Sequence, residues 1–385
     1  DMTEEFYRDM KALKVDSVSL YAKASEHIDE IIEQVKGLLD KGYAYRLNGD
    51  VYYDISRFPD YGRLSGQKPG ELVRHRIDPR PGKRSPGDFA LWKAEKPGEP
   101  SWDSPWGRGR PGWHIEDTAI TYAYFGASYD IHGGALELIF PHHEAEIAQM
   151  EALTGVKPMV KYWIHTGLLT IGGKKMSKSL KNFITIREAL SRHSPEALRI
   201  FFAMTHYRSP IDYDEAEVSS VAKFTTALNQ AYRMAKRRLE LGEFSEKGEK
   251  DVSGLEEDVR RVWDYVERFH AFMGDDFNTP RAIGAIGEFT HFVYKCLDGI
   301  PSRRLLEEIL KAYETFDRVI GFIEEKGEAG GEEILKNVLD AVLEVREMLR
   351  AEKRFDLSDM IREKLEEAGI KVEDSPEGPK WSIKQ

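Results

Sequence analysis

The chain has 385 residues, a formal net charge of −11, 41% hydrophobic residues and 32% charged residues. These values indicate a globular protein of roughly two to four domains, and the absence of any long apolar run excludes a transmembrane helix. One cysteine, Cys296, excludes an internal disulfide and fits a reduced, cytoplasmic setting. The acidic balance argues against indiscriminate nucleic-acid binding but is compatible with a local basic track.

The first part of the chain predicts a helix followed by a hairpin. Apolar residues recur at helical spacing over residues 25–41, and Ser25 is a candidate N-cap. Residues 43–54 then alternate in polarity around Asn48-Gly49, which is a hairpin signal. Residues 56–112 are rich in Gly, Pro and Arg, so we expect a loop-dominated insertion with short strands.

From Gly112 onward the pattern changes to alternating strands and helices. Residues 113–125 look helical and stop at Gly126, residues 128–132 form a short buried strand, and residues 160–171 are rich in strand formers. Between them, a helix begins at Pro141 and ends at Gly155. This order predicts an α/β unit with a parallel sheet.

After residue 215 the chain is almost wholly helical, which predicts a helical bundle. A polar, Gly-containing linker follows at 324–333. Two more helices are expected near 334–350 and 356–368, with a final hairpin over 370–384.

The stretch GGKKMSKSLKN, residues 172–182, gathers four lysines beside two glycines in an acidic chain. It lacks the spacing of a P-loop. A flexible loop with ammonium groups could stabilise charge that develops on a phosphate during its transfer. A solvated surface cluster is the simpler interpretation of the composition alone.

His142 and Glu146 form a second candidate site. They are four residues apart on a predicted helix, so their side chains leave the same face and can bind Zn²⁺ together. His143, three residues from Glu146, could also reach it, and spacing does not choose between them. An exposed helix face rich in His and Glu would give the same pattern.

Seven segments, which occur along the chain in the family's order, together resemble the cysteinyl-tRNA synthetases, a family of class I aminoacyl-tRNA synthetases. Lys175-Met176-Ser177-Lys178-Ser179 matches the second signature of that class. The other segments are DFALWK (88–93), GRPGWHIE (109–116), DIHGG (130–134), FPHHEAEIAQ (140–149), HYRSPIDY (206–213) and DDFNTP (275–280). The resemblance covers essentially the whole chain.

The resemblance implies a two-step reaction. Cysteine attacks the α-phosphate of ATP, which enters with Mg²⁺, and the cysteinyl group then passes to the terminal adenosine of tRNA(Cys). It also implies that Lys178 binds ATP, while Lys175 and Ser177 shape the catalytic loop. Because positioning and electrostatics carry most of such catalysis, no nucleophilic side chain is required.

The resemblance further implies a Zn²⁺ that binds the substrate thiolate and selects cysteine over serine. It assigns His142, rather than His143, and Glu146 as ligands. The family's cysteine ligand after GWHIE is replaced by Asp117, so the sequence is compatible with a mixed oxygen–nitrogen site, a weakened site or no metal site.

The same resemblance places Trp113 and His132 in the pocket for cysteine and its adenylate. Both adjoin glycines, where backbone can approach a ligand closely. His114 and His165 are on matching segments but could equally be packed histidines. A third glycine of the family motif is replaced by Ala135.

No HIGH-like signature occurs, and the chain begins at Asp1 without an initiator methionine. We therefore expect that the chain begins inside a longer protein and lacks the first nucleotide-binding half, so that it is incomplete for activity. The expected fold is α/β of the class I synthetase type, with a helical and anticodon-binding C-terminal part. The predicted domains are an inserted segment (1–110), the second Rossmann half (111–170), the KMSKS region (171–215), a helical bundle (216–323) and an anticodon module (334–385).

In the C-terminal module, Arg350, Asp359 and Asp374 are candidates to bind the anticodon. Arg can bind guanine through two hydrogen bonds, and a carboxylate can accept from cytosine N4. Trp381 is a candidate stacking or core residue. A solvated helix face with ion pairs would explain most of the basic residues here.

We therefore predict a cysteine–tRNA ligase with ATP, L-cysteine and tRNA(Cys) as partners, no membrane association and a monomeric state. A ligase that joins cysteine to an amino sugar is one alternative, although it would not need the long C-terminal part. A tRNA-binding paralogue without activity is the other.

Overall fold

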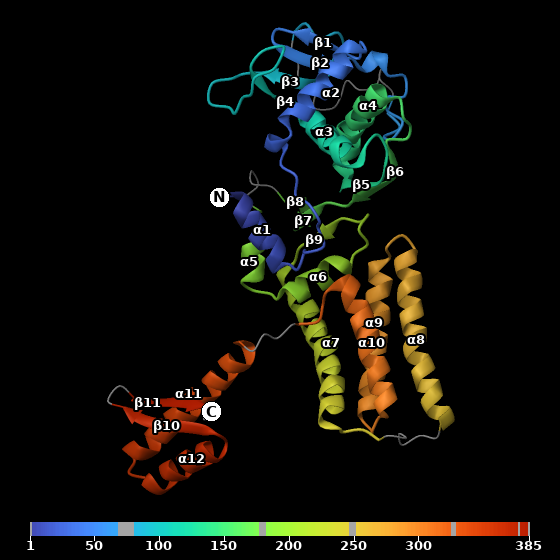
Figure 1. The fold of residues 1–385 in the computed structure, drawn as a ribbon. Coiled ribbons are helices and arrows are strands. Elements are labelled where there is room, and N and C mark those ends of the chain that lie inside the picture. Colours follow the sequence, from blue (N-terminus) through green and yellow to red (C-terminus); the bar gives the residue numbers. More distant parts are fainter. Residues whose placement is uncertain are drawn as a thin grey trace. The chain divides into compact units, whose positions relative to one another are not determined.

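The computed structural model describes residues 2–67, 81–176, 182–245, 252–324, 329–375 and 378–383. They divide into two compact units, Asp1–Phe322 and Ile323–Gln385 (Figure 1). None of the helices in these described ranges is both long enough and apolar enough to cross a lipid bilayer.

The first unit begins with two helices and an antiparallel sheet. The helices are α1 (Met2–Ala12) and α2 (Ile28–Asp40), and the sheet has the order β1 (Ala44–Leu47), β2 (Asp50–Tyr53), β3 (Phe89–Ala94), β4 (Gly109–Pro111). Asn48 and Gly49 both have positive φ, 50° and 86°, which confirms the predicted hairpin turn. The predicted helix is confirmed, but its start at Ser25 is wrong: Ser25 lies in a short 3₁₀ turn, and α2 follows His27.

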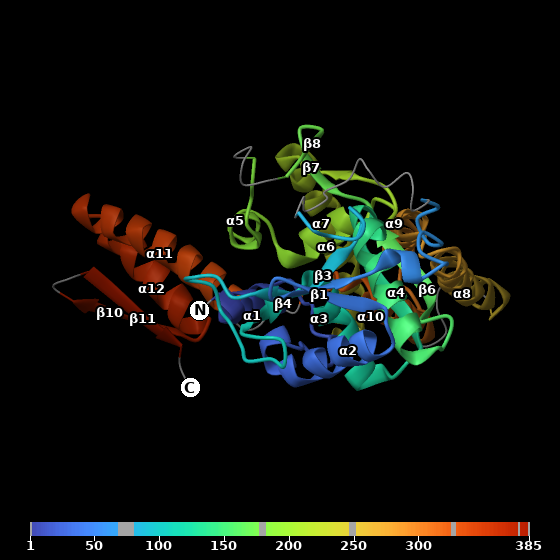
Figure 2. The same cartoon turned by 90° about the horizontal axis from the view of Figure 1, so that it is seen from above.

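The α/β unit contains α3 (Trp113–Phe125), β5 (Tyr129–Ala135), α4 (Glu144–Thr154) and β6 (Val160–Thr166). β5 and β6 pair in parallel, with α4 between them in sequence, which confirms the predicted crossover. Figures 1 and 2 show α2, α3 and α4 side by side, and their apolar faces share one core with β2 and β3.

Two details of this unit differ from the sequence prediction. α4 begins at Glu144 and not at Pro141, because the preceding turn Ile139–His143 contains Phe140 in an extended conformation (φ −133°, ψ 133°). β5 is not a buried strand: of its residues only Tyr129 is buried, since its polar and glycine residues line a site rather than a core.

A small three-stranded sheet follows, with β7 (Leu169–Ile171) between β8 (Lys174–Lys175) and β9 (Ile211–Asp212). Between β8 and β9 lie the short helices α5 (Ile186–Leu190) and α6 (Pro195–Ala203). α5 has a full capping box, in which Thr185 and Glu188 satisfy each other's backbone N–H groups.

The rest of the first unit is the predicted helical bundle. It consists of α7 (Glu215–Leu241), α8 (Val252–Gly274), α9 (Thr279–Leu297) and α10 (Arg303–Ile320). α10 shows why these sequences form helices: Ser302 accepts a hydrogen bond from the backbone of Leu305, and Leu306, Ile309 and Phe316 form a buried stripe.

The second unit contains α11 (Ala329–Ala351), α12 (Phe355–Glu367), β10 (Ile370–Ser375) and β11 (Gly378–Ile383). The predicted final hairpin is confirmed, since β10 and β11 pair antiparallel. The helix expected over 334–350 begins earlier, at Ala329, so part of the predicted linker is helical.

Candidate active site and metal centre

A glycine brings the first turn of α3 close to the sheet. A Cβ atom on Gly112 would lie 1.8 Å from the carbonyl oxygen of Ala90, so only glycine fits at this N-cap. The close approach places Trp113, His114 and Asp117, on the first turns of α3, beside the turn that precedes α4.

His142 lies between two carboxylates. Its Nε2 atom is 2.9 Å from Asp117 Oδ2 and 2.8 Å from Glu146 Oε1, and His142 and Glu146 are both buried. Burial alone would lower the pKa of His142, but the two carboxylates outweigh it and raise the pKa to about 9. Burial raises the pKa of Glu146 to about 7, against the opposing effect of His142.

His143 points to a second group of ligand atoms that shares Glu146. His132 Nε2 lies 3.4 Å from Glu146 Oε2, and His143 Nδ1 lies 2.8 Å from His165 Nε2. Burial and the neighbouring histidines lower the pKa of His143 to about 3. A Cβ on Gly134 would lie 2.8 Å from His143 Cε1, so this glycine of β5 makes room for the imidazole.

Both three-residue groups could hold a metal ion. In each, Asp117–His142–Glu146 and His132–His143–Glu146, one potential ligand atom per residue lies within 4.8 Å of the others. Both Glu146 oxygens are buried and have no hydrogen-bond partner among the described residues, although the imidazoles are near. A buried carboxylate in this state fits a metal ligand, and an oxygen–nitrogen donor set suits Zn²⁺.

Aromatic rings line this group of histidines and carboxylates. Trp113 is 55% exposed and stacks on His142, with ring centroids 4.3 Å apart. His114 Nδ1 lies 2.7 Å from His142 Nδ1, and burial, followed by the repulsion of His142, lowers the pKa of His114 to about 3. His114 and His165 therefore belong to the same cluster as His132 and His142.

Two residues of the cluster were not predicted from the sequence. Tyr129 Oη lies 2.6 Å from His132 Nδ1, and the Trp163 ring is 4.8 Å from that of His132 and 4.9 Å from that of His143. The signal for Trp163 was available, because Trp163 and His165 are two apart on a strand and so share a face. We call these ten residues the histidine cluster: Trp113, His114, Asp117, Tyr129, His132, His142, His143, Glu146, Trp163 and His165.

The lysine-rich segment begins in a tight turn. Gly172 and Gly173 have φ of 60° and 69° and join β7 to β8. Lys175 ends β8 and makes an ion pair with Glu137, which follows β5. Ser177 and Lys178 lie outside the described residues.

The predicted anticodon residues lie on three elements of the second unit. Arg350 is on α11, where its Nη1 atom is 3.7 Å from a Glu347 carboxylate oxygen. Asp359 is exposed on α12, and Asp374 is on β10, where its side chain lies outside the described residues. Trp381 donates toward Asp340 of α11 at 3.4 Å, which favours its role as a residue packed on that helix.

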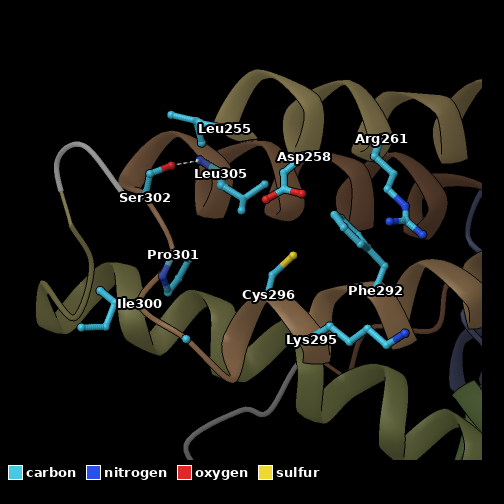
Figure 3. A pocket seen from close by; sticks show the side chains of 11 residues that line it. Leu255, Asp258, Arg261, Phe292, Lys295, Cys296, Ile300, Pro301, Ser302 and Leu305 are labelled. Carbon is cyan, nitrogen blue, oxygen red and sulfur yellow. Dashed lines mark hydrogen bonds between the residues drawn. The ribbon is translucent and has the colours of Figure 1, made fainter. Parts of the chain in front are cut away.

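A separate cavity of about 330 Å³ lies in the helical bundle, between α8, α9 and the start of α10 (Figure 3). Cys296, the one cysteine of the sequence, is on its wall. The Arg261 guanidinium lies 5.0 Å over the ring of Phe292. Because Cys296 lies here on α9, the histidine cluster contains no thiolate ligand from this chain.

Comparisons with known proteins first define the class. Residues 1–223 match the family of tRNA synthetases class I (C) catalytic domains, and residues 268–324 match the DALR domain. A Campylobacter jejuni crystal structure assigned as an arginyl-tRNA synthetase superposes with a TM-score of 0.53 at 14% identity, over 83% of this chain and 66% of that one. The protein has the fold of a class I aminoacyl-tRNA synthetase.

Curated relatives narrow this class. The chain is 43% identical to the cysteine–tRNA ligase of Thermococcus onnurineus, over 99% of this chain and 81% of the relative. It is 44% identical to that of Pyrococcus abyssi (98% and 79%) and 40% identical to that of Aquifex aeolicus (99% and 80%). The chain belongs to the cysteine–tRNA ligase family, which confirms the resemblance found in its motifs.

Proposed function

We propose that this protein activates cysteine with ATP and transfers it to tRNA(Cys). Family membership over 98–99% of the chain supports this reaction. The histidine cluster carries this proposal to particular residues, because six of its ten members lie on the motif segments 109–116, 130–134 and 140–149. The amino-sugar ligase and the inactive tRNA-binding paralogue are not favoured, because the relatives that share this length are cysteine–tRNA ligases.

We propose that Asp117, His142 and Glu146 hold Zn²⁺. When bound, the ion would supply a Lewis acid that favours the thiolate form of the substrate cysteine. In this set Asp117 gives an oxygen where the sequence motif predicts a sulfur. Its side chain is 43% exposed, whereas Glu146 is completely buried, so Asp117 is on the open side of the site.

The neighbouring residues would shape the substrate pocket. The exposed ring of Trp113 stacks on His142, and the half-buried His132 approaches Glu146. His132 is held by Tyr129, which fixes the orientation of the imidazole. Low pKa values keep His114 and His143 neutral at pH 7, so they offer hydrogen bonds without adding positive charge.

For the activation step, we propose that Lys178 binds the phosphates of ATP, assisted by Lys175 and Ser177. The turn at Gly172-Gly173 brings the start of this segment beside Glu137, near the end of β5. Ammonium groups placed there would stabilise negative charge that develops on the phosphates as pyrophosphate leaves.

We also propose the domains predicted from the sequence: an inserted segment over 1–110, the second Rossmann half over 111–170, the KMSKS region over 171–215, a helical bundle over 216–323 and an anticodon module over 334–385. In the last, Arg350, Asp359 and Asp374 would read anticodon bases. The DALR match, residues 268–324, lies in the bundle and not in this module, so the proposed anticodon residues require a separate test.

The test of the proposed function is cysteine-dependent exchange of pyrophosphate into ATP by the intact protein, with metal analysis of the same sample. We expect exchange with cysteine, at least a hundredfold less with serine, and about one zinc per chain. If protein that contains no zinc catalysed the exchange, the result would support the proposed activity and contradict the metal assignment. An absence of exchange in a zinc-loaded protein would contradict the proposed activity.

A further inference from the structure

Tyr129 and Glu146 contact the two ring nitrogens of His132. Tyr129 is the first residue of β5, and its side chain is buried. Its Oη atom lies 2.6 Å from His132 Nδ1. At the other ring nitrogen, His132 Nε2 lies 3.4 Å from Glu146 Oε2. The imidazole of His132 therefore lies between a hydroxyl group and a carboxylate.

The Tyr129 hydroxyl can meet His132 Nδ1 in two ways. Burial raises the pKa of Tyr129, so the phenol keeps its hydrogen and can donate it to Nδ1. In the alternative arrangement, Tyr129 donates to Thr121, whose hydroxyl is also near, and accepts a hydrogen from Nδ1. The first arrangement leaves the hydrogen of a neutral imidazole on Nε2, whereas the second leaves a lone pair on Nε2.

Glu146 favours the first of these arrangements. Its side chain is completely buried, and Oε2 has no hydrogen-bond partner within the described ranges. A hydrogen on His132 Nε2 would attract this carboxylate oxygen, whereas a lone pair on Nε2 would repel it. A doubly protonated imidazole would also carry a hydrogen on Nε2, so this result does not depend on the charge of His132.

We propose that Tyr129 is a positioning residue, which keeps a hydrogen on His132 Nε2 and directs it at Glu146. This role depends on the zinc site proposed above, because Glu146 is one of its ligands. A metal ion requires a nitrogen lone pair, so His132 does not bind zinc through the ring nitrogen that faces Glu146. The Tyr129–His132 pair supports Glu146 as a ligand and excludes the alternative metal group that contains His132.

The first test is ¹⁵N NMR of the intact, zinc-loaded protein with labelled histidines, since ring nitrogens with and without a hydrogen give separate signals. The His132 signals are assigned by their loss in His132→Gln. We expect a hydrogen on His132 Nε2 both before and after a chelator removes the zinc. Zinc bound at Nε2 would displace that hydrogen and overturn the proposal. The measurement needs no exchange activity, so its result is separate from that of the proposed reaction.

The variant Tyr129→Phe removes the hydroxyl group and keeps the ring. We expect its His132 signals to show hydrogen on Nδ1 as well as on Nε2. Its dissociation constant for zinc, measured by competition with a chelator, should rise about tenfold, because groups that hold a metal ligand in place contribute on this scale. An unchanged hydrogen position or an unchanged zinc affinity in Tyr129→Phe would contradict the positioning role.

The matched control is Tyr294→Phe. Tyr294 Oη donates to the backbone oxygen of Ala227 at 2.9 Å in the helical bundle, so this variant also loses one hydroxyl hydrogen bond. Its zinc affinity should stay within about twofold of the parent. Equal weakening by both variants would show a general loss of stability and refute a specific role of Tyr129. If Tyr129→Phe does not fold, the NMR of the parent protein still decides whether His132 Nε2 holds hydrogen or zinc.

Discussion

The proposed functional residues of the histidine cluster and those of the second unit differ in how closely they contact other side chains. The cluster joins ten residues from two helices, two strands and a turn. Carboxylates raise the pKa of His142, while burial raises the pKa of Glu146 and lowers that of His143. In the second unit, Asp359 is exposed and Arg350 has a weak ion pair with a residue one turn away. The side chains of the proposed substrate site thus hold one another in place, whereas the proposed anticodon residues lie on three separate elements of the second unit.

We expect His142→Ala to have the largest effect on zinc content and activity. It removes the imidazole that joins Asp117 to Glu146, leaves two carboxylates facing each other and deletes a proposed zinc ligand. We expect loss of zinc and a fall in cysteine-dependent pyrophosphate exchange of about a hundredfold or more. Elemental analysis and the exchange assay measure both.

The matched control is His291→Ala, at an exposed histidine of α9. It should retain zinc and exchange. If His142→Ala retained its full zinc content, the metal would bind elsewhere, and the alternative group of His132, His143 and Glu146 would become the candidate.

Lys178→Ala should have the next largest effect. Loss of one charge-assisted contact to the phosphates costs about 1.5–3 kcal/mol, which corresponds to a fall in exchange of roughly tenfold to a hundredfold. Zinc content should not change, since Lys178 is not a ligand. Lys236→Ala on α7 is the control, and an equal effect of the two variants would contradict a role for the lysine-rich loop in catalysis.

Arg350→Ala tests the anticodon role proposed for the second unit. We expect the KM for tRNA(Cys) to rise about tenfold, because a bidentate contact to a base contributes about 1–3 kcal/mol of discrimination. Cysteine-dependent exchange, which needs no tRNA, should stay constant. Arg362→Ala on α12 is the control for a general loss of positive charge, and a parallel loss of exchange and aminoacylation by Arg350→Ala would refute the anticodon role.

The parts of the fold that the sequence predicted are those that depend on local chemistry. Asn48-Gly49 demands a tight turn, Gly126 and Gly155 end helices, and residues 128–132 and 160–171 were predicted as strand segments around a helix. The helix start at Glu144 was missed, although Phe140 directly precedes Pro141 and the residue before a proline is disfavoured in helical backbone.

Only part of the histidine cluster was predicted, because only part of it follows from local sequence patterns. Spacing predicted that Glu146 lies beside His142 or His143, and the resemblance to the family chose His142 and added Asp117, Trp113 and His132. The participation of Tyr129 and Trp163 depends on the parallel pairing of β5 with β6. Contacts of this kind join residues far apart in the chain, and no local pattern contains them.

Asp117→Cys should give the smallest change in activity, and it tests directly whether residue 117 is a zinc ligand. A thiolate is a softer ligand than a carboxylate and binds zinc more tightly, so the variant should keep its zinc at chelator concentrations that strip the parent protein. Because His142 and Glu146 remain, we expect exchange with cysteine to change by less than about threefold. Asp356→Cys, which adds a thiol at an exposed position of α12 outside the cluster, is the control for zinc captured by any new cysteine. A variant that holds zinc no better than the parent would mean that Asp117 contacts His142 as an ion-pair partner only, and that the metal, if bound, uses the other members of the cluster.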